Sequence, residues 1–147
     1  MADSTQSSID IAADPATVLD IIADFEAYPE WATQVKRAEV LSEDDLGWPL
    51  QVKFELDAAP IRASYVLEYD WDVTEDGTGT VDWHLVSSDL LKGLDGTYTI
   101  TAAGDGCAVN YKLAVALKLP VIGALRNKAE RTIIDTALDG LKKRAEG

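Results

Sequence analysis

Cysteine and histidine are almost absent from this chain, which holds one of each, Cys107 and His84. A single cysteine cannot form a disulfide within the chain, and such cysteine usage fits a reducing compartment, so we expect a cytoplasmic protein. A structural zinc site needs about four nitrogen or sulfur ligands, more than these two residues supply. The sequence also lacks a glycine-rich phosphate loop and the G-x-S-x-G and H-E-x-x-H motifs. We therefore expect no metal and no cofactor.

Basic residues and long apolar runs are also scarce. Lysine and arginine number 13 against 26 aspartates and glutamates, so the net charge is −13 at pH 7. Nucleic acids and anionic membrane surfaces both need clustered basic residues, so we expect neither as a partner. No run of about 18 apolar residues occurs, which predicts no integral membrane association. The acidic surface favours a monomer, and the length of 147 residues fits one domain over residues 1–147.

The end of the chain, from Pro120 to Ala145, carries the clearest periodic pattern. The apolar residues that recur every four positions are Leu125, Ala129, Ile133, Ala137, Leu141 and Ala145, and Ile122, Ile134 and Leu138 widen this stripe. Charged residues, with Arg126 and Glu130 among them, occupy the other faces, and Pro120 suits a first helical turn. The pattern predicts a long amphipathic helix. Its apolar stripe needs a partner, and a curved sheet is the natural one.

Most of the preceding chain alternates between apolar and polar residues, which is typical of antiparallel strands with one solvated face. A strand over residues 5–12 precedes two short helices, one from Asp14-Pro15 to about Ala23 and one from Asp24 to Trp31. The six strands predicted after these helices span Val35–Leu41, Trp48–Ala58, Ile61–Trp71, Thr80–Val86, Gly96–Ala102 and Val109–Leu117. The sequence therefore predicts an α+β domain in which a sheet packs against the terminal helix.

Several short segments resemble one family. They are Ala13-Asp14-Pro15-Ala16-Thr17-Val18, Phe25-x-x-Tyr28-Pro29-Glu30-Trp31, Leu94-x-Gly96-x-Tyr98 and Tyr111-x-Leu113, and the long terminal helix completes the pattern. The chain resembles the polyketide cyclase/dehydrase-like and lipid-transfer proteins of the START-like (SRPBCC) superfamily over essentially its whole length. The resemblance implies a helix-grip fold, in which a curved seven-stranded antiparallel sheet wraps around the terminal helix, with two short helices between strands 1 and 2. It also implies an elongated apolar cavity for ligands such as lipids, sterols, quinones, plant hormones or polyketide intermediates.

The aromatic face of the predicted sheet is the best candidate for the wall of such a cavity. A curved sheet cannot contact one helix along its whole concave surface, and the helix stripe uses small residues, Ala129 and Ala137. Tyrosine suits a pocket of this kind, since it offers an apolar ring and a hydroxyl that orients a ligand. The residues expected to line the cavity are Phe54, Tyr65, Leu67, Tyr69, Trp83, Tyr98 and Tyr111 from the sheet and Leu125, Ala129 and Ile133 from the helix.

These residues favour a protein that binds a hydrophobic or amphipathic small molecule without covalent chemistry of its own, and no catalytic residue is assigned. The alternative is a polyketide aromatase/cyclase or dehydratase, in which the cavity tyrosines would be the acid or base groups. His84 reads as a solvent-facing strand residue rather than a general base, and Cys107 as an ordinary residue beside a turn. A third hypothesis is an interaction module, in which the segment Phe25 to Trp31 or the loop around Leu90-Leu91 contacts a partner.

Overall fold

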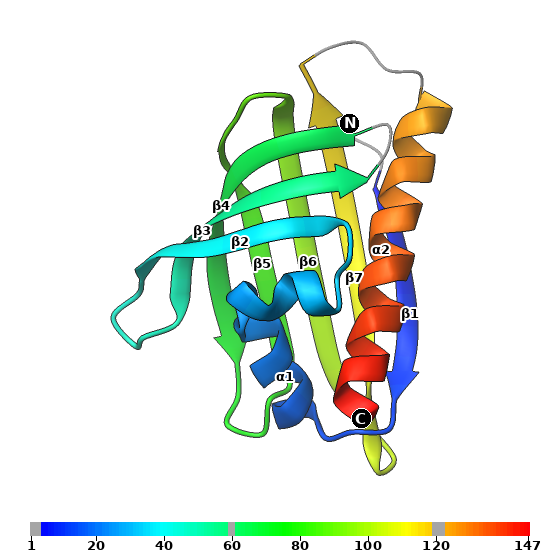
Figure 1. Ribbon diagram of the computed structural model, residues 1–147. Helices are drawn as coiled ribbons and strands as arrows, with labels where there is room; N and C mark the ends of the chain where they lie inside the picture. Colours follow the sequence, from blue (N-terminus) through cyan, green and yellow to red (C-terminus); the bar gives the residue numbers. More distant parts are fainter. Residues whose placement is uncertain (1–3, 59–60, 119–122) are drawn as a thin grey trace.

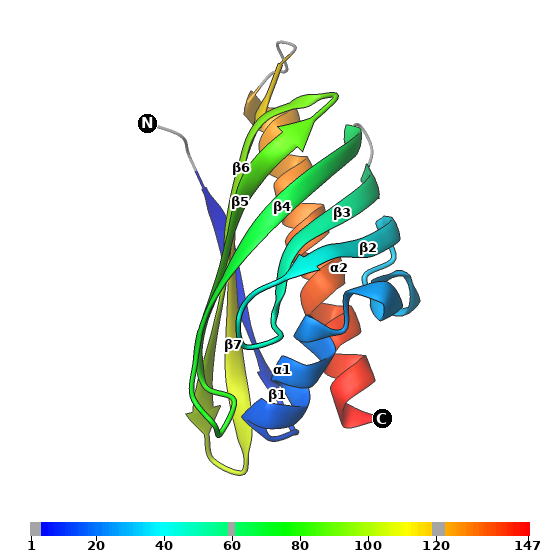
Figure 2. The same cartoon turned by 90° about the vertical axis from the view of Figure 1, so that its left-hand side faces the viewer.

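A seven-stranded antiparallel sheet dominates the computed structural model, which describes residues 4–58, 61–118 and 123–147. The elements in chain order are β1 (Thr5–Ile11), α1 (Pro15–Ala23), the 3₁₀ helix η1 (Phe25–Glu30), β2 (Val35–Glu43), β3 (Pro49–Ala58), β4 (Ile61–Val73), β5 (Gly79–Ser88), β6 (Leu91–Ala103), β7 (Gly106–Leu117) and α2 (Gly123–Glu146). The strand order is β1-β7-β6-β5-β4-β3-β2, so the first strand pairs with the last. Strands β2–β4 curve over α2, which lies on the concave side of the sheet (Figures 1 and 2). The predicted α+β helix-grip fold is confirmed.

Two short helices close one end of the sheet. Asp14 caps α1 by accepting a hydrogen bond from the backbone N–H of Thr17 at 3.1 Å, and Pro15 occupies the first turn. The next helix, η1, packs against α2 at Gly140, where an added Cβ would lie only 1.9 Å from the carbonyl oxygen of Trp31. Glycine at this position therefore lets the end of η1 approach the helix closely. In addition, α1 contacts α2 and η1 contacts β2, and α1 lies in the lower part of the molecule in Figure 1.

Strand β6 begins five residues earlier than the sequence pattern predicts, at Leu91 instead of Gly96. Its first residues pair with β7, with Leu91 opposite Leu117 and Leu94 opposite Val115, and a register shift separates Leu91 from Gly93. A shift of this kind breaks the two-residue alternation by which a strand is recognised in sequence. Residues 91–95 therefore show no regular alternation of apolar and polar residues, although Leu91 and Leu94 are both buried.

The buried face of helix α2 follows most of the predicted apolar stripe but differs from it at Leu125 and Glu130. Its buried residues are Ala129, Glu130, Ile134, Ala137, Leu138 and Leu141, whereas Leu125 is 40% exposed. Glu130, expected on a polar face, is fully buried and accepts hydrogen bonds from the Thr5 hydroxyl at 2.8 Å and the Val115 N–H at 2.7 Å. The helix therefore packs its charged residue against β1 and β7. Pro120 and Ile122, which were also assigned to this helix, lie outside the described residues.

Candidate functional site

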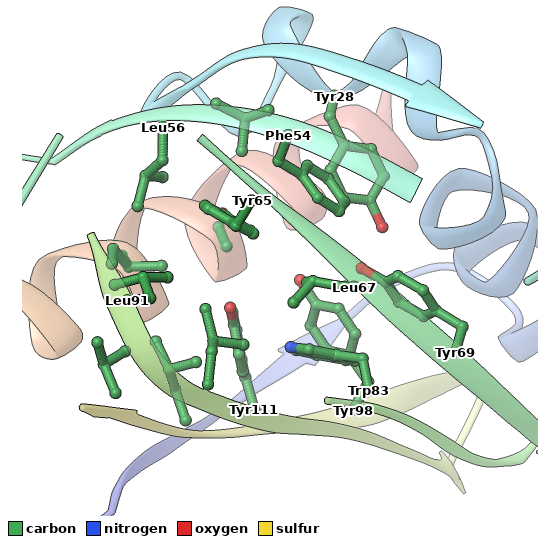
Figure 3. A pocket seen from close by; sticks show the side chains of 16 residues that line it. Tyr28, Phe54, Leu56, Tyr65, Leu67, Tyr69, Trp83, Leu91, Tyr98 and Tyr111 are labelled. Atoms are coloured by element: carbon green, nitrogen blue, oxygen red, sulfur yellow. The ribbon is translucent and has the colours of Figure 1, made fainter. Parts of the chain in front are cut away.

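A pocket lies between the concave face of the sheet and α2 (Figure 3). Its volume is about 70 Å³, counted as the space open to the centre of a water molecule. A volume of this size is enough to hold water molecules. The sixteen lining residues are Tyr28, Val35, Phe54, Leu56, Tyr65, Leu67, Tyr69, Trp83, Leu91, Leu94, Tyr98, Tyr111, Leu113, Val115, Ile133 and Ala137. Tyrosine is the only one of these residue types with a titratable side chain.

The strand register brings the aromatic side chains together on one face. Tyr69 lies opposite Trp83 across β4 and β5, and Tyr98 lies opposite Tyr111 across β6 and β7. Directly paired residues point to the same face of a sheet, so their rings meet. The ring centroids are 5.5 Å apart for Tyr69 and Trp83, 5.2 Å for Trp83 and Tyr98, and 4.6 Å for Tyr98 and Tyr111. The four rings form a continuous wall across the middle strands.

Gly96 makes room for the largest ring in this wall. It pairs with Trp83 across β5 and β6, and a Cβ built on it would lie 2.2 Å from Cε2 of the indole. Any side chain at position 96 would displace that ring. The Leu94-x-Gly96-x-Tyr98 segment therefore has a physical meaning, because the glycine lets the indole lie against the β6 backbone while Leu94 and Tyr98 flank it on the pocket side.

The polar atoms of the pocket differ in whether they have a hydrogen-bond partner in the protein. The Tyr28 hydroxyl donates a hydrogen bond to the carbonyl oxygen of Ile22 at 2.5 Å. Within the described residues, no protein partner is found for the hydroxyls of Tyr69, Tyr98 and Tyr111 or for Nε1 of Trp83, and Figure 3 shows all four atoms directed into the pocket. These four atoms are therefore available to a bound molecule.

Burial controls the protonation of the pocket tyrosines. The loss of solvation raises the pKa of Tyr65, Tyr69, Tyr98 and Tyr111 above the usual tyrosine value, and the neighbouring hydroxyls of the cluster raise it further for the first three. Each phenol thus stays protonated at neutral pH. The hydroxyls can donate and accept hydrogen bonds, but they are poor general bases.

Eight of the ten residues predicted to line the cavity do line this pocket, namely Phe54, Tyr65, Leu67, Tyr69, Trp83, Tyr98, Tyr111 and Ile133. The other two, Leu125 and Ala129, lie elsewhere. Leu125 is 40% exposed, and Ala129 is buried but does not reach the pocket. The pocket lies beside Ile133 and Ala137, further along α2 than Leu125 and Ala129. Ala137, two turns further along α2, is the small helical residue that lines the pocket.

The lining residues that the prediction omitted fall into two groups. Leu56, Leu113 and Val115 share the inward alternation of Phe54 and Tyr111 in their strands and could have been found from it. Tyr28, Val35, Leu91 and Leu94 come from η1, from the start of β2 and from the irregular start of β6, where no simple alternation points inward. Leu91 and Leu94 are both buried, so neither side chain offers an exposed surface to a partner.

The reactive residue types lie outside the pocket. His84 is on the outer face of the sheet with 59% of its side chain exposed, and its Nε2 lies 3.5 Å from Oε2 of Glu68. Cys107 is buried near the β6–β7 turn, where burial raises the pKa of its thiol. Among the described residues, no group of three His, Cys, Asp or Glu side chains is placed to hold a metal ion. Within the same residues, no helix is both long and apolar enough to cross a membrane.

Comparison with known proteins identifies relatives over the whole chain. A family model described as polyketide cyclase/dehydrase and lipid transport matches residues 2–146. Among curated proteins, no sequence matches the chain. Solved structures also share this fold. A START superfamily protein from Mycobacterium smegmatis is 22% identical over 97% of each chain, with a TM-score of 0.87.

Two further structures with this fold come from proteins whose names describe different functions. The Zhui aromatase/cyclase from a Streptomyces species is 14% identical over 99% of this chain and 94% of its own, with a TM-score of 0.78. A STAR-related lipid transfer protein from Xanthomonas axonopodis is 18% identical over 98% of this chain and 86% of its own, with a TM-score of 0.75. At these identities the similarity shows the fold alone.

Proposed function

Because the chain belongs to the polyketide cyclase/dehydrase and lipid transport family, we propose that it binds a hydrophobic or amphipathic small molecule between the sheet and α2. The observation that carries this proposal is the pocket of about 70 Å³ with an apolar and aromatic lining. The ligand classes that suit it are lipids, quinones, sterols and polyketide-like molecules. The ligand-binding residues would be the sixteen that line the pocket, including eight of those predicted from the sequence.

Desolvation would supply most of the binding free energy. Each Å² of apolar ligand surface removed from water contributes about 25 cal/mol, from which the cost of ordering the ligand is subtracted. The pocket has a volume of about 70 Å³. It therefore accommodates a small ring system or one end of a longer molecule, and a larger ligand would extend beyond it or displace side chains.

A polyketide aromatase/cyclase or dehydratase is the second candidate. The observation in its favour is the set of phenolic hydroxyls that face the pocket, since they could orient a folded polyketone chain. Two features make binding the preferred proposal. The part of the pocket lining that the structure describes contains no histidine, lysine or carboxylate, and the raised pKa of the tyrosines makes them weak acids and poor bases.

The setting proposed for this binding protein follows from composition. A net charge of −13 and a single cysteine support a cytoplasmic monomer whose main partner is the small molecule. The same charge argues against nucleic acid as a partner.

Native mass spectrometry of freshly purified protein tests the proposal, together with the variant Ala137→Leu as a control. Ala137 lines the pocket, so a leucine there would occupy the space that a ligand needs. We expect a discrete adduct on the natural protein that denaturation releases, and loss of that adduct in the variant. The mass of the released molecule would identify the ligand class. An adduct of equal occupancy in Ala137→Leu would show binding elsewhere and contradict the proposal.

A further inference from the structure

The two ends of the pocket differ in chemistry. In Figure 3, Leu56 and Leu91 lie at one end, and Tyr69, Trp83 and Tyr98 lie at the other. The leucine end offers mainly apolar surface, and Tyr65 and Tyr111 lie between the two ends, with Tyr111 packed against Tyr98. The other end has apolar rings and also presents polar atoms to the empty space. A ligand held in this pocket would therefore meet most of the hydrogen-bonding groups towards one end.

Every polar atom at this end can donate a hydrogen bond, and the phenolic hydroxyls can also accept one. Nε1 of Trp83 can only donate, and a phenolic hydroxyl donates readily to an oxygen acceptor. Trp83, Tyr69, Tyr98 and Tyr111 are each at most 7% exposed, and within the described residues none of their polar atoms has a protein partner. A buried donor without a partner costs about 1–3 kcal/mol. The four polar atoms here are open to water in the empty pocket, so this cost arises when a ligand displaces the water. A ligand that supplies an acceptor avoids the cost, whereas a hydrocarbon incurs it.

The ring contacts hold these donors in position. Tyr98 packs against both Trp83 and Tyr111, with centroid distances of 5.2 and 4.6 Å, and Gly96 fixes how closely the indole approaches β6. Side chains that are already packed lose little rotamer freedom when a ligand binds. The donors are therefore arranged before the ligand arrives, and the direction in which they point selects where its acceptor lies.

No charge is available to neutralise an ionic ligand group. Among the described residues, the lining contains no lysine, arginine or histidine, and the four tyrosines that line the sheet side are kept protonated by burial. Transfer of a carboxylate from water into such a site costs far more than transfer of a neutral group. The net charge of −13 adds a further penalty for anions.

We propose that the end of the pocket formed by Tyr69, Trp83, Tyr98 and Tyr111 recognises an uncharged oxygen acceptor, such as a ketone or quinone carbonyl, and that the leucine end receives the apolar remainder of the ligand. This inference rests on the proposed function, since it assigns the ligand class and orientation within the same pocket. It separates neutral carbonyl compounds from carboxylates such as free fatty acids and from plain hydrocarbons.

Three molecules of nearly equal shape test the inference. They are 2-acetylnaphthalene, which carries a ketone, 2-isopropenylnaphthalene, in which a methylene replaces the oxygen, and 2-naphthoate, which carries a carboxylate. Equilibrium dialysis gives a dissociation constant for each with the full chain. We expect the ketone to bind roughly tenfold more tightly than the hydrocarbon and at least tenfold more tightly than the carboxylate.

Substitutions of lining residues test which part of the pocket causes the preference for the ketone over the hydrocarbon. Tyr98→Phe and Tyr111→Phe each remove one hydroxyl and should reduce the ratio between hydrocarbon and ketone dissociation constants by roughly 3- to 10-fold. Ile133→Val is the matched control, because it trims the apolar lining and should weaken both neutral molecules while keeping their ratio. Urea unfolding of each variant verifies that the protein is folded at the temperature of the dialysis.

The outcomes distinguish the inference from the proposed function. Equal affinity for ketone and hydrocarbon, or a ratio that neither tyrosine substitution changes, overturns the inference and leaves the binding pocket standing. Tightest binding of 2-naphthoate overturns it as well. Failure of all three molecules to bind at millimolar concentration contradicts the proposed function itself.

Discussion

Ala137→Leu and Ala129→Leu make the same chemical change at two buried positions of α2, and the pocket predicts opposite effects. Ala137 lines the pocket and is 6% exposed, whereas Ala129 is 1% exposed and lies outside it. The substitution adds three carbon atoms to a helix, and leucine and alanine have similar helix propensities. The difference between the two variants therefore reports on the space available around each side chain.

The expected magnitudes follow from burial. In Ala137→Leu the added carbons enter existing space, and each buried methylene contributes about 0.8 kcal/mol, less about 0.5–1 kcal/mol for lost rotamer freedom. The free energy of unfolding should rise by roughly 1–2 kcal/mol. In Ala129→Leu the carbons have no such space, and overpacking should lower the free energy of unfolding by about 1–3 kcal/mol.

Urea denaturation followed by circular dichroism measures both values, and the slope of the transition shows whether the unfolded state has changed. A thermal scan gives a second reading, since a change of 1 kcal/mol moves the midpoint by roughly 2–4 °C in a domain of about this size. If Ala137→Leu destabilises the protein as much as Ala129→Leu, the space beside Ala137 is not open in solution. The reasoning that connects the pocket to ligand binding would then be wrong.

Three further substitutions test other parts of the structure, each by urea denaturation. Gly96→Ala should lower the free energy of unfolding by about 1–3 kcal/mol and alter the near-ultraviolet circular dichroism, because the new Cβ would meet the Trp83 indole at 2.2 Å; an unchanged spectrum would contradict this packing. Glu130→Ala should cost about 1–3 kcal/mol by leaving the Val115 N–H without an acceptor, and Glu130→Gln, which keeps one acceptor oxygen, should cost less; equal losses would refute that reason. Hydrogen bonds from threonines of its turn lower the pKa of Asp76 from 3.8 to about 2, so its contribution to stability is present above about pH 4 and is lost as the pH falls towards 2. Asp76→Asn should therefore flatten the pH dependence of stability in that window, and an unchanged profile would refute the assignment.

The alternation of apolar and polar residues was enough to predict most of the sheet. Strands with one buried face repeat every two residues, and β3, β4, β5 and β7 keep that repeat through their middle sections, so their inward residues were identified correctly. The pairing of β1 with β7 is different, because it joins Thr5 to Leu113 across the whole chain. No local pattern encodes a contact at that separation, so the sequence did not predict this pairing.

The helix shows where periodicity is insufficient. A four-residue spacing treats every charged residue as solvent-facing, and Glu130 was placed there for that reason. A carboxylate can be buried when its oxygens accept hydrogen bonds, and Glu130 has two such donors, one from β1 and one from β7. These donors are contributed by tertiary structure, more than a hundred residues away in the case of Thr5. The sequence around Glu130 therefore contains no signal for its burial.

The buried Glu130 also helps to explain why the pocket exists. Helix α2 packs mainly against β1 and β7, at one edge of the sheet, and Glu130 joins it to both strands. A helix held at this edge cannot also cover the middle strands, whose inner faces carry Tyr69, Trp83 and Tyr98. Those rings bury their apolar surfaces by packing against one another. The tyrosine hydroxyls and the indole nitrogen then point into the space that the helix does not fill. The position of the helix thus determines both the volume of the pocket and the hydrogen-bonding character of one end, so a ligand would be selected by size and by the placement of its acceptor together.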